Sequence, residues 1–161
     1  MICDDISGFA AALPAGRGLL GLDPGTKTIG VAVSDRLLSA ASPLETVKRG
    51  KFTADAARLA RIVAAREIGG VIVGLPANMD GSEGPRAQSA RAFARNLSRA
   101  AGFEGVPIAF WDERLSTVAA ERALLEADAT RKRRAEVIDA VAAGYILQGA
   151  LDRLRHLRAE T

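Results

Sequence analysis

Residues 19–34 read LLGLDPGTKTIGVAVS, and this stretch decides the class of fold. Two apolar runs, residues 19–22 and 28–33, flank a short segment that contains proline and glycine. Apolar runs of this length separated by turn-forming residues are typical of a β-hairpin. The sequence therefore predicts two paired strands at the start of a sheet, with Asp23 at the end of the first strand.

The chain downstream of the hairpin alternates between strand and helix patterns. Residues 71–75 form a continuous apolar run, which is typical of a strand buried on both faces of a parallel sheet. The alternating order predicts an α/β domain in which a five-stranded mixed sheet carries helices on both faces. The elements expected in chain order are a short strand at 44–48, a helix at 53–67, the strand at 71–75, a helix from 85, a strand at 107–111, a helix from 116 or 117 to about 127, a basic loop at 131–134 and a helix at about 135–155.

The composition fits one such domain with an apolar core. The chain has 161 residues, of which 48% are hydrophobic, and this length leaves no room for a second catalytic domain. Residues 17–155 are predicted to form the domain, with a flexible arm at 1–16 before it and a tail at 156–161 after it. No apolar run approaches the ~20 residues that a membrane helix needs.

Charge and cysteine content narrow the class of function. The formal net charge of +3 is a weak indication of a polyanionic partner such as nucleic acid, because an arginine-rich composition alone gives the same bias. Cys3 is the only cysteine, so the chain has no internal disulfide and no thiolate cluster. Asp4 and Asp5 stand where a secretory signal carries basic residues. The sequence therefore predicts a cytoplasmic protein with no membrane partner.

Acidic residues stand where the predicted sheet would bring them together. Asp23 ends the first strand, Asp112 and Glu113 follow the strand at 107–111, and Asp139 lies in the last predicted helix. Parallel sheets place their sites at the carboxyl ends of the strands, and acids gathered there repel one another unless a cation balances them. Carboxylate oxygens, in a chain with a single histidine, favour Mg²⁺ or Mn²⁺ over zinc.

Asp112 and Glu113 cannot both face Asp23, because successive side chains of a strand point to opposite sides. Glu113 has the longer side chain and is our choice, and Asp112 is expected to reach Arg114 or a backbone donor instead. Each acid also has a structural interpretation. Asp23 would then be a turn residue, Asp112 part of a surface ion pair, and Asp139 a solvated acid on a helix.

Four blocks of the sequence resemble one known family. They are GLDPGTKTIGVAVSD at 21–35, VGLPANMDGSEGPRA at 73–87, DERLST at 112–117 and a fourth block within 131–148. In this order they resemble the YqgF or RuvX family, known as pre-16S rRNA nucleases and Holliday-junction-resolvase-like proteins with an RNase H fold. The similarity runs from about Gly18 to Asp152.

The resemblance implies an RNase H-like, metal-dependent nuclease that matures the precursor end of 16S rRNA. It implies Asp23, Glu113 and Asp139 as the catalytic and metal-binding acids, with Mg²⁺ or Mn²⁺ as the cofactor. The identity of the second acid is undecided. Related resolvases take it from the end of the fourth strand, and in this sequence that strand ends without an acid. Asp112 and Glu83 are the alternatives to Glu113. The residues expected to contact nucleic acid are Lys27, Asn78, Arg86, Arg114, Arg131, Arg133 and Arg134.

Other functions remain as alternatives. A Holliday-junction-resolvase-like DNA nuclease would have the same acids, and a non-catalytic RNA-binding module of ribosome assembly would keep the fold alone. A sugar-kinase or actin-like ATPase begins with a similar DxGT hairpin, but it needs two such domains and this chain holds one. The sequence leaves open whether an RNA precursor or branched DNA is the partner, whether cleavage is endo- or exonucleolytic, and whether the chain forms a homodimer.

Overall fold

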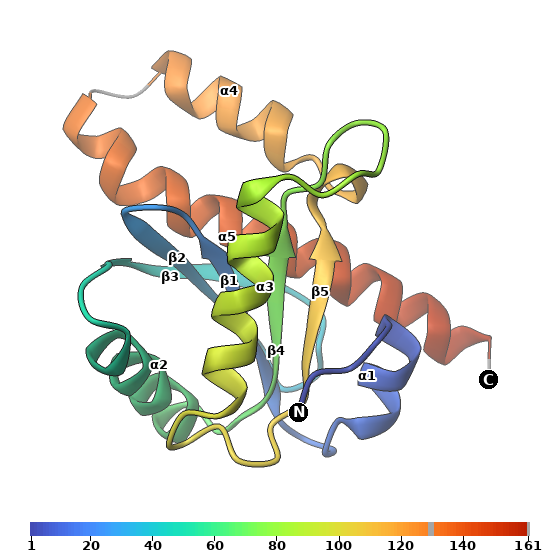
Figure 1. Ribbon diagram of the computed structural model, residues 1–161. Helices are drawn as coiled ribbons and strands as arrows, with labels where there is room; N and C mark the ends of the chain where they lie inside the picture. The colour runs from blue at the N-terminus through green and yellow to red at the C-terminus, as the bar shows by residue number, and fades with distance from the viewer. Residues whose placement is uncertain (129–130, 161) are drawn as a thin grey trace.

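A computed structural model of the protein describes residues 1–128 and 131–160, without the side chains of residues 128 and 131–136. The chain folds into alternating strands and helices around one sheet (Figure 1). The elements are α1 (Ile6–Ala12), β1 (Gly18–Pro24), β2 (Thr28–Ser34), β3 (Ala41–Lys48), α2 (Phe52–Ala65), β4 (Ile68–Leu75), α3 (Pro85–Ser98), β5 (Ile108–Asp112), the 3₁₀ helix η1 (Glu113–Leu115), α4 (Val118–Asp128) and α5 (Arg131–Ala159).

The strands form one mixed sheet in the order β3-β2-β1-β4-β5. β2 pairs antiparallel with both β1 and β3, whereas β4 pairs parallel with both β1 and β5. The predicted five-stranded mixed sheet is therefore confirmed. Because β1, β4 and β5 run in the same direction, their carboxyl ends lie along one edge of the sheet, and in Figure 1 the arrowheads of β4 and β5 end near the β4–α3 loop.

Helices cover both faces of the sheet, as predicted (Figure 1). On one face α2 and α3 pack against alternate residues of β1, Leu20 and Leu22. On the other face α1 and α5 pack against Leu19 and its neighbours in the sheet. Since side chains alternate along a strand, Gly21 and Asp23 face α5 together with Leu19.

The first sixteen residues differ from the predicted flexible arm. The side chain of Asp5 accepts a hydrogen bond from Gly8 N at 2.7 Å and caps α1, and Phe9 is fully buried against α5 and the sheet. Cys3 N donates to the carbonyl of Ile108 at 2.7 Å, so the residues before α1 also join the sheet edge. The prediction was wrong because a short segment with glycine and proline resembles a linker until its apolar residues have a surface to cover.

The last helix extends further at both ends than predicted. α5 begins at Arg131, so the backbone of the predicted basic loop 131–134 is helical, and the predicted tail is helical as far as Ala159. Arginine, lysine and glutamate are good helix formers, so a charged run does not mark where a helix ends. Within the described part of the chain, no helix is both long and apolar enough to cross a membrane.

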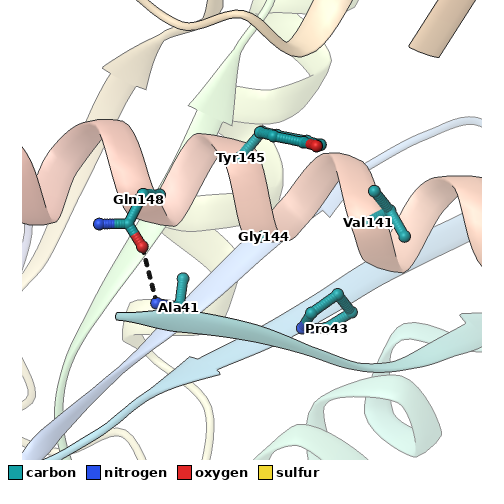
Figure 2. Close-up of a pocket in the computed structure, with 6 residues that line it drawn as sticks. All are labelled: Ala41, Pro43, Val141, Gly144, Tyr145 and Gln148. Carbon is teal, nitrogen blue, oxygen red and sulfur yellow. Dashed lines mark hydrogen bonds between the residues drawn. The ribbon is translucent and has the colours of Figure 1, made fainter. Parts of the chain in front are cut away.

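α5 also lies against the edge strand β3. Gln148 Oε1 accepts a hydrogen bond from Ala41 N at 2.9 Å (Figure 2). An open pocket of about 250 Å³ lies between the helix and the strand, lined by Ala41, Pro43, Val141, Gly144, Tyr145 and Gln148. None of the residues predicted to carry chemistry lines this pocket, so it is not the predicted site.

Two glycines let α5 approach the sheet at β1 and β2. A Cβ atom at Gly30 would lie 1.9 Å from the carbonyl oxygen of Asp139, and one at Gly21 would lie 2.7 Å from Leu147 Cβ. Both distances are far shorter than a van der Waals contact, so no larger residue fits. Gly30 is the direct partner of Asp23 in the β1–β2 ladder. The same contact therefore holds the backbone of Asp139 near Asp23.

We expect Gly30→Ala to lower the free energy of unfolding by roughly 3 kcal/mol, the upper end of the usual cost of overpacking, because α5 would have to move away from the sheet. Urea denaturation followed by circular dichroism measures this change. Gly50→Ala is the matched control, since the nearest atom to its new Cβ is 4.0 Å away, and it should change stability by less than about 0.5 kcal/mol. Wild-type stability in Gly30→Ala would contradict the close packing of α5.

Candidate active site

Asp23 is a buried acid at the carboxyl end of β1, with 6% of its surface exposed. Arg122 of α4 donates a hydrogen bond from Nη2 to Asp23 Oδ2 at 2.6 Å. Burial raises the pKa of Asp23, and the positive charge of Arg122 opposes that rise. Asp23 is therefore the centre of a cluster of ionisable groups at the sheet edge.

Glu113 contacts Asp23 from the start of η1. It follows Ala109 and Trp111 of β5, which face α5. Its side chain lies across the end of β4, where a Cβ atom at Gly74 would be 3.0 Å from Glu113 Oε1. The Glu113 carboxyl group hydrogen-bonds to Asp23, and burial, together with the negative charge of Asp23, raises the pKa of Glu113 to about 7. The two carboxyl groups thus share a proton near neutral pH.

Asp139 approaches this pair from α5. Thr28 Oγ1, at the start of β2, donates a hydrogen bond to Asp139 Oδ2 at 2.5 Å. The negative charge of Asp139 contributes to the raised pKa of Asp23. In residues 1–128 and 131–160, no three acidic, histidine or cysteine side chains are close enough to hold a metal ion together as they stand. Asp23 and Glu113 are hydrogen-bonded to each other, and Asp139 is within electrostatic range of Asp23.

Two arginines supply positive charge to these acids. Arg86 is exposed at the start of α3, and its positive charge opposes the rise in the pKa of both Asp23 and Glu113. Arg86 is among the residues predicted to contact nucleic acid, whereas the sequence analysis missed Arg122. No local pattern marks Arg122, which lies in a helix with other charged residues. Its contact with Asp23 exists because α4 packs near the end of β1.

The two alternative acids, Asp112 and Glu83, have other partners. Asp112 accepts hydrogen bonds from Arg114 N at 2.9 Å and Arg114 Nη2 at 2.6 Å, which is the pairing that the sequence predicted. Glu83 accepts from Arg91 Nε at 2.5 Å. These hydrogen bonds hold the pKa of each acid below its ordinary value. Of the three candidates for the second acid, Glu113 is the one whose carboxyl group contacts Asp23.

Three of the predicted nucleic-acid contacts lie near the acids, two of them in loops and Arg114 in η1. Lys27 is exposed in the turn between β1 and β2. Asn78 belongs to the β4–α3 loop, where its Nδ2 donates to Ser82 Oγ at 3.0 Å. Arg114 contacts the same loop, since its Nη1 donates a hydrogen bond to the carbonyl of Met79 at 3.2 Å. The side chains of Arg131, Arg133 and Arg134 lie outside the described residues.

The arrangement offers oxygen donors next to an opening that carries positive charge. A pocket of about 160 Å³ lies between the β1–β2 turn and the start of α3, lined by Pro24, Gly25, Thr26, Pro85, Arg86 and Ser89. Arg86, which lines this pocket, also acts electrostatically on Asp23 and Glu113. Carboxyl groups bind cations and a guanidinium group binds anions such as phosphate. The site therefore suits a phosphate group and a cation bound side by side.

Comparison with known proteins supports the resemblance found in the sequence. A family model described as "RuvX: Holliday junction resolvase" matches residues 17–153. A protein of Roseobacter denitrificans named "Putative pre-16S rRNA nuclease" is 72% identical over 160 residues, which cover 99% of this chain and 98% of that protein. A protein of the same name from Paracoccus denitrificans is 68% identical over 157 residues, which cover 98% of each. The predicted resemblance is therefore confirmed.

Among solved structures, RuvC of Thermus thermophilus has a similar fold. RuvC in complex with a Holliday junction substrate aligns with a TM-score of 0.54 and 19% identity, covering 85% of this chain and 94% of RuvC. A second RuvC structure aligns with the same TM-score of 0.54 and covers 89% of this chain and 97% of RuvC. At this identity the likeness concerns the fold alone, and the predicted RNase H-like fold is confirmed.

The stability of the metal-free protein should depend on the proton that Asp23 and Glu113 share. The pKa of Glu113 is about 7 in the folded protein, against an ordinary value of 4.5. Between these two values the folded state holds more of this proton than the unfolded state does. The contribution of Glu113 to the free energy of unfolding is therefore fully present at acid pH and is lost as the pH rises through this window.

Glu113→Gln has no such proton to lose, so we expect its melting temperature in a chelating buffer to exceed that of the wild type at pH 8 and to fall less between pH 5 and pH 8. Scanning calorimetry at several pH values, on the order of one unit apart, measures the difference. Asp112→Asn is the control: the pKa of Asp112 is lowered, so the group stays ionised over this range and the variant should keep the wild-type dependence. An identical pH dependence in Glu113→Gln and wild type would mean that the proton is not shared.

Proposed function

This chain belongs to the RuvX family, and from that premise we propose that it is a metal-dependent nuclease that hydrolyses phosphodiester bonds in the RNA precursor of 16S rRNA. One observation carries the proposal: the carboxyl groups of Asp23 and Glu113 are in contact at the carboxyl edge of the sheet, beside the charge of Asp139. Burying ionisable groups together costs free energy, and apolar residues of similar volume often stabilise a fold as well or better. The arrangement is therefore better explained by chemistry than by folding.

The chemistry of the donor set suits a divalent cation. Asp23, Glu113 and Asp139 offer only oxygen atoms, which Mg²⁺ and Mn²⁺ prefer, and an ion would relieve the repulsion among the three. These residues would hold the ion after Glu113 has lost its proton. A bound ion of this kind lowers the pKa of water and balances the negative charge that develops on a phosphate undergoing hydrolysis.

The other residues of the site would position the acids and the nucleic acid. Thr28 orients the carboxylate of Asp139 through its hydrogen bond. Arg86 lines the pocket at the start of α3, where its guanidinium group would bind a phosphate oxygen. Lys27, exposed in the neighbouring turn, would bind the phosphate of an adjacent nucleotide. Further phosphate groups along the nucleic acid would be contacted by the remaining predicted residues, Asn78, Arg114, Arg131, Arg133 and Arg134.

We favour RNA as the substrate because the relatives quoted above carry the name of a putative pre-16S rRNA nuclease. Branched DNA is the second candidate, which the description of the family as Holliday junction resolvases favours. Both are phosphodiester polyanions, so the acids and arginines described above would serve either one. The proposed compartment is the cytoplasm, in keeping with the lone Cys3.

We expect Asp23→Asn to reduce cleavage by more than about 100-fold, because it removes a charged ligand and even partners that only orient a metal ligand typically contribute about 10- to 100-fold. Asp139→Asn should behave in the same way. The measurement is cleavage of a labelled 16S rRNA precursor and of a labelled four-way DNA junction, each with and without Mn²⁺. Asp152→Asn, an exposed acid on the same helix as Asp139, is the matched control and should leave the rate unchanged.

The outcomes separate the candidate functions. Mn²⁺-dependent cleavage of the RNA and not of the junction supports the proposal, and the reverse selects a DNA junction nuclease. Full activity of Asp23→Asn on the same substrate would overturn the assigned site. A wild-type protein that binds the RNA and cuts neither substrate with Mn²⁺ would instead be a non-catalytic RNA-binding module.

A further inference from the structure

The ion pair between Arg122 and Asp23 joins α4 to the centre of the sheet edge. Arg122 Nη2 lies 2.6 Å from Asp23 Oδ2, and the Asp23 side chain is 7% exposed while that of Arg122 is 26% exposed. The other ion pairs in the described part of the chain join more exposed carboxylates. Among the ion pairs of the described residues, Arg122 therefore balances the most buried carboxylate.

Arg122 and a divalent cation would meet at the same carboxylate group, that of Asp23. A metal ion held by Asp23 binds a carboxylate oxygen directly, and Oδ2 already accepts the short hydrogen bond from Arg122. The guanidinium group cannot lose its charge in a protein, so it cannot remain beside the ion as a neutral group. Two cations on one buried carboxylate repel each other strongly. Arg122 in its present position therefore opposes binding of the ion.

α4 can accept a movement of Arg122 with little loss of packing. Among its residues 118–127, Val118 alone is buried, and Leu124 is 62% exposed. The helix lies at the edge of the molecule above α5 in Figure 1, away from the apolar core between the sheet and α2 and α3. A side chain or a helix with so few buried contacts can be displaced at small cost in free energy.

We propose that Arg122 is the resident counterion of Asp23, that a divalent cation displaces it, and that the released guanidinium group then binds a phosphate of the nucleic acid at the same edge. This inference rests on the proposed function, since it assumes that Asp23 binds a metal ion. Arg122 thereby keeps the acid pair stable before the ion arrives and becomes a substrate-positioning residue afterwards. Arg86 faces the same acids without a hydrogen bond to Asp23, so it has no equivalent role in the exchange.

Arg122→Gln separates this exchange from a purely structural role. If Arg122 competes with the ion, the variant should bind Mn²⁺ about 10-fold or more tightly than wild type, because no charged hydrogen bond has to be broken first. Its melting temperature in a chelating buffer should be lower than that of the wild type, and saturating Mn²⁺ should restore it. A purely structural role predicts the opposite change, weaker Mn²⁺ binding in the variant. Isothermal titration calorimetry with Mn²⁺ alone and thermal melts measure both effects without nucleic acid.

Two further variants make the result specific. Arg122→Lys keeps the positive charge, so its Mn²⁺ affinity should stay close to that of the wild type and below that of Arg122→Gln. Arg58→Gln removes an arginine from another 2.6 Å ion pair, with Glu45, and should bind Mn²⁺ as the wild type does. In cleavage assays at saturating Mn²⁺, Arg122→Gln should raise the KM for RNA, because it lacks the phosphate contact.

The failure of this inference is distinguishable from that of the proposed function. If the wild type binds Mn²⁺ and Arg122→Gln binds it equally or more weakly, the counterion exchange is wrong and the metal site stands. If Arg122→Gln binds Mn²⁺ more tightly with an unchanged KM, the exchange stands and the phosphate contact is wrong. If neither wild type nor Arg122→Gln binds Mn²⁺, the metal-dependent function is wrong, and the exchange fails with it.

Discussion

The contact between the backbone of α5 and Gly30 is the constraint on which the site depends. Because Gly30 has no side chain, the carbonyl group of Asp139 occupies the space of its Cβ atom, directly beside the strand partner of Gly30, Asp23. Two other glycines leave similar space for a side chain: Leu147 lies over Gly21 of β1, and Glu113 lies over Gly74 of β4. Glycines on the α5 face of the sheet therefore make the room in which the acids meet.

The two buried acids among the side chains that the structure describes differ in how their charge is satisfied. Asp55, at the start of α2, accepts hydrogen bonds from Gly50 N at 3.1 and 3.2 Å, which is a local structural role. Asp23 has instead an arginine from α4 and a second carboxyl group from η1 as partners. A backbone donor is a permanent partner, whereas Arg122 and the proton of Glu113 can both be exchanged for another cation. This difference in partners supports the proposal that Asp23 belongs to a functional site.

Local geometry predicted from the sequence that Glu113 faces Asp23 and that Asp112 pairs with Arg114, and these are the partners in the structure. The sequence predicts that two adjacent acids at the end of a strand point to opposite sides, and the pairing of Asp112 with Arg114 follows from their proximity in the chain. In the structure Asp112 ends β5 and Glu113 begins η1. The same kind of reasoning failed for α1, because Phe9 is buried by residues of α5 and the sheet that are far from it in sequence. It also failed at the start of α5, where the composition allows either a helix or a loop.

The sequence by itself determined the order of strands and helices, the mixed sheet with helices on both faces, and the identity of the acids at its edge. The elements follow from hydrophobic periodicity and turn-forming residues, which act between neighbours in the chain. The acids follow from their places along these elements and from the resemblance to a known family. The tertiary structure alone decided that α1 packs on the core, that Asp23 and Glu113 share a proton, and that Arg122 balances Asp23. The physical reason is that the partner of a buried charge is set by the packing of elements that are distant in the chain, and no local pattern of residues records that packing.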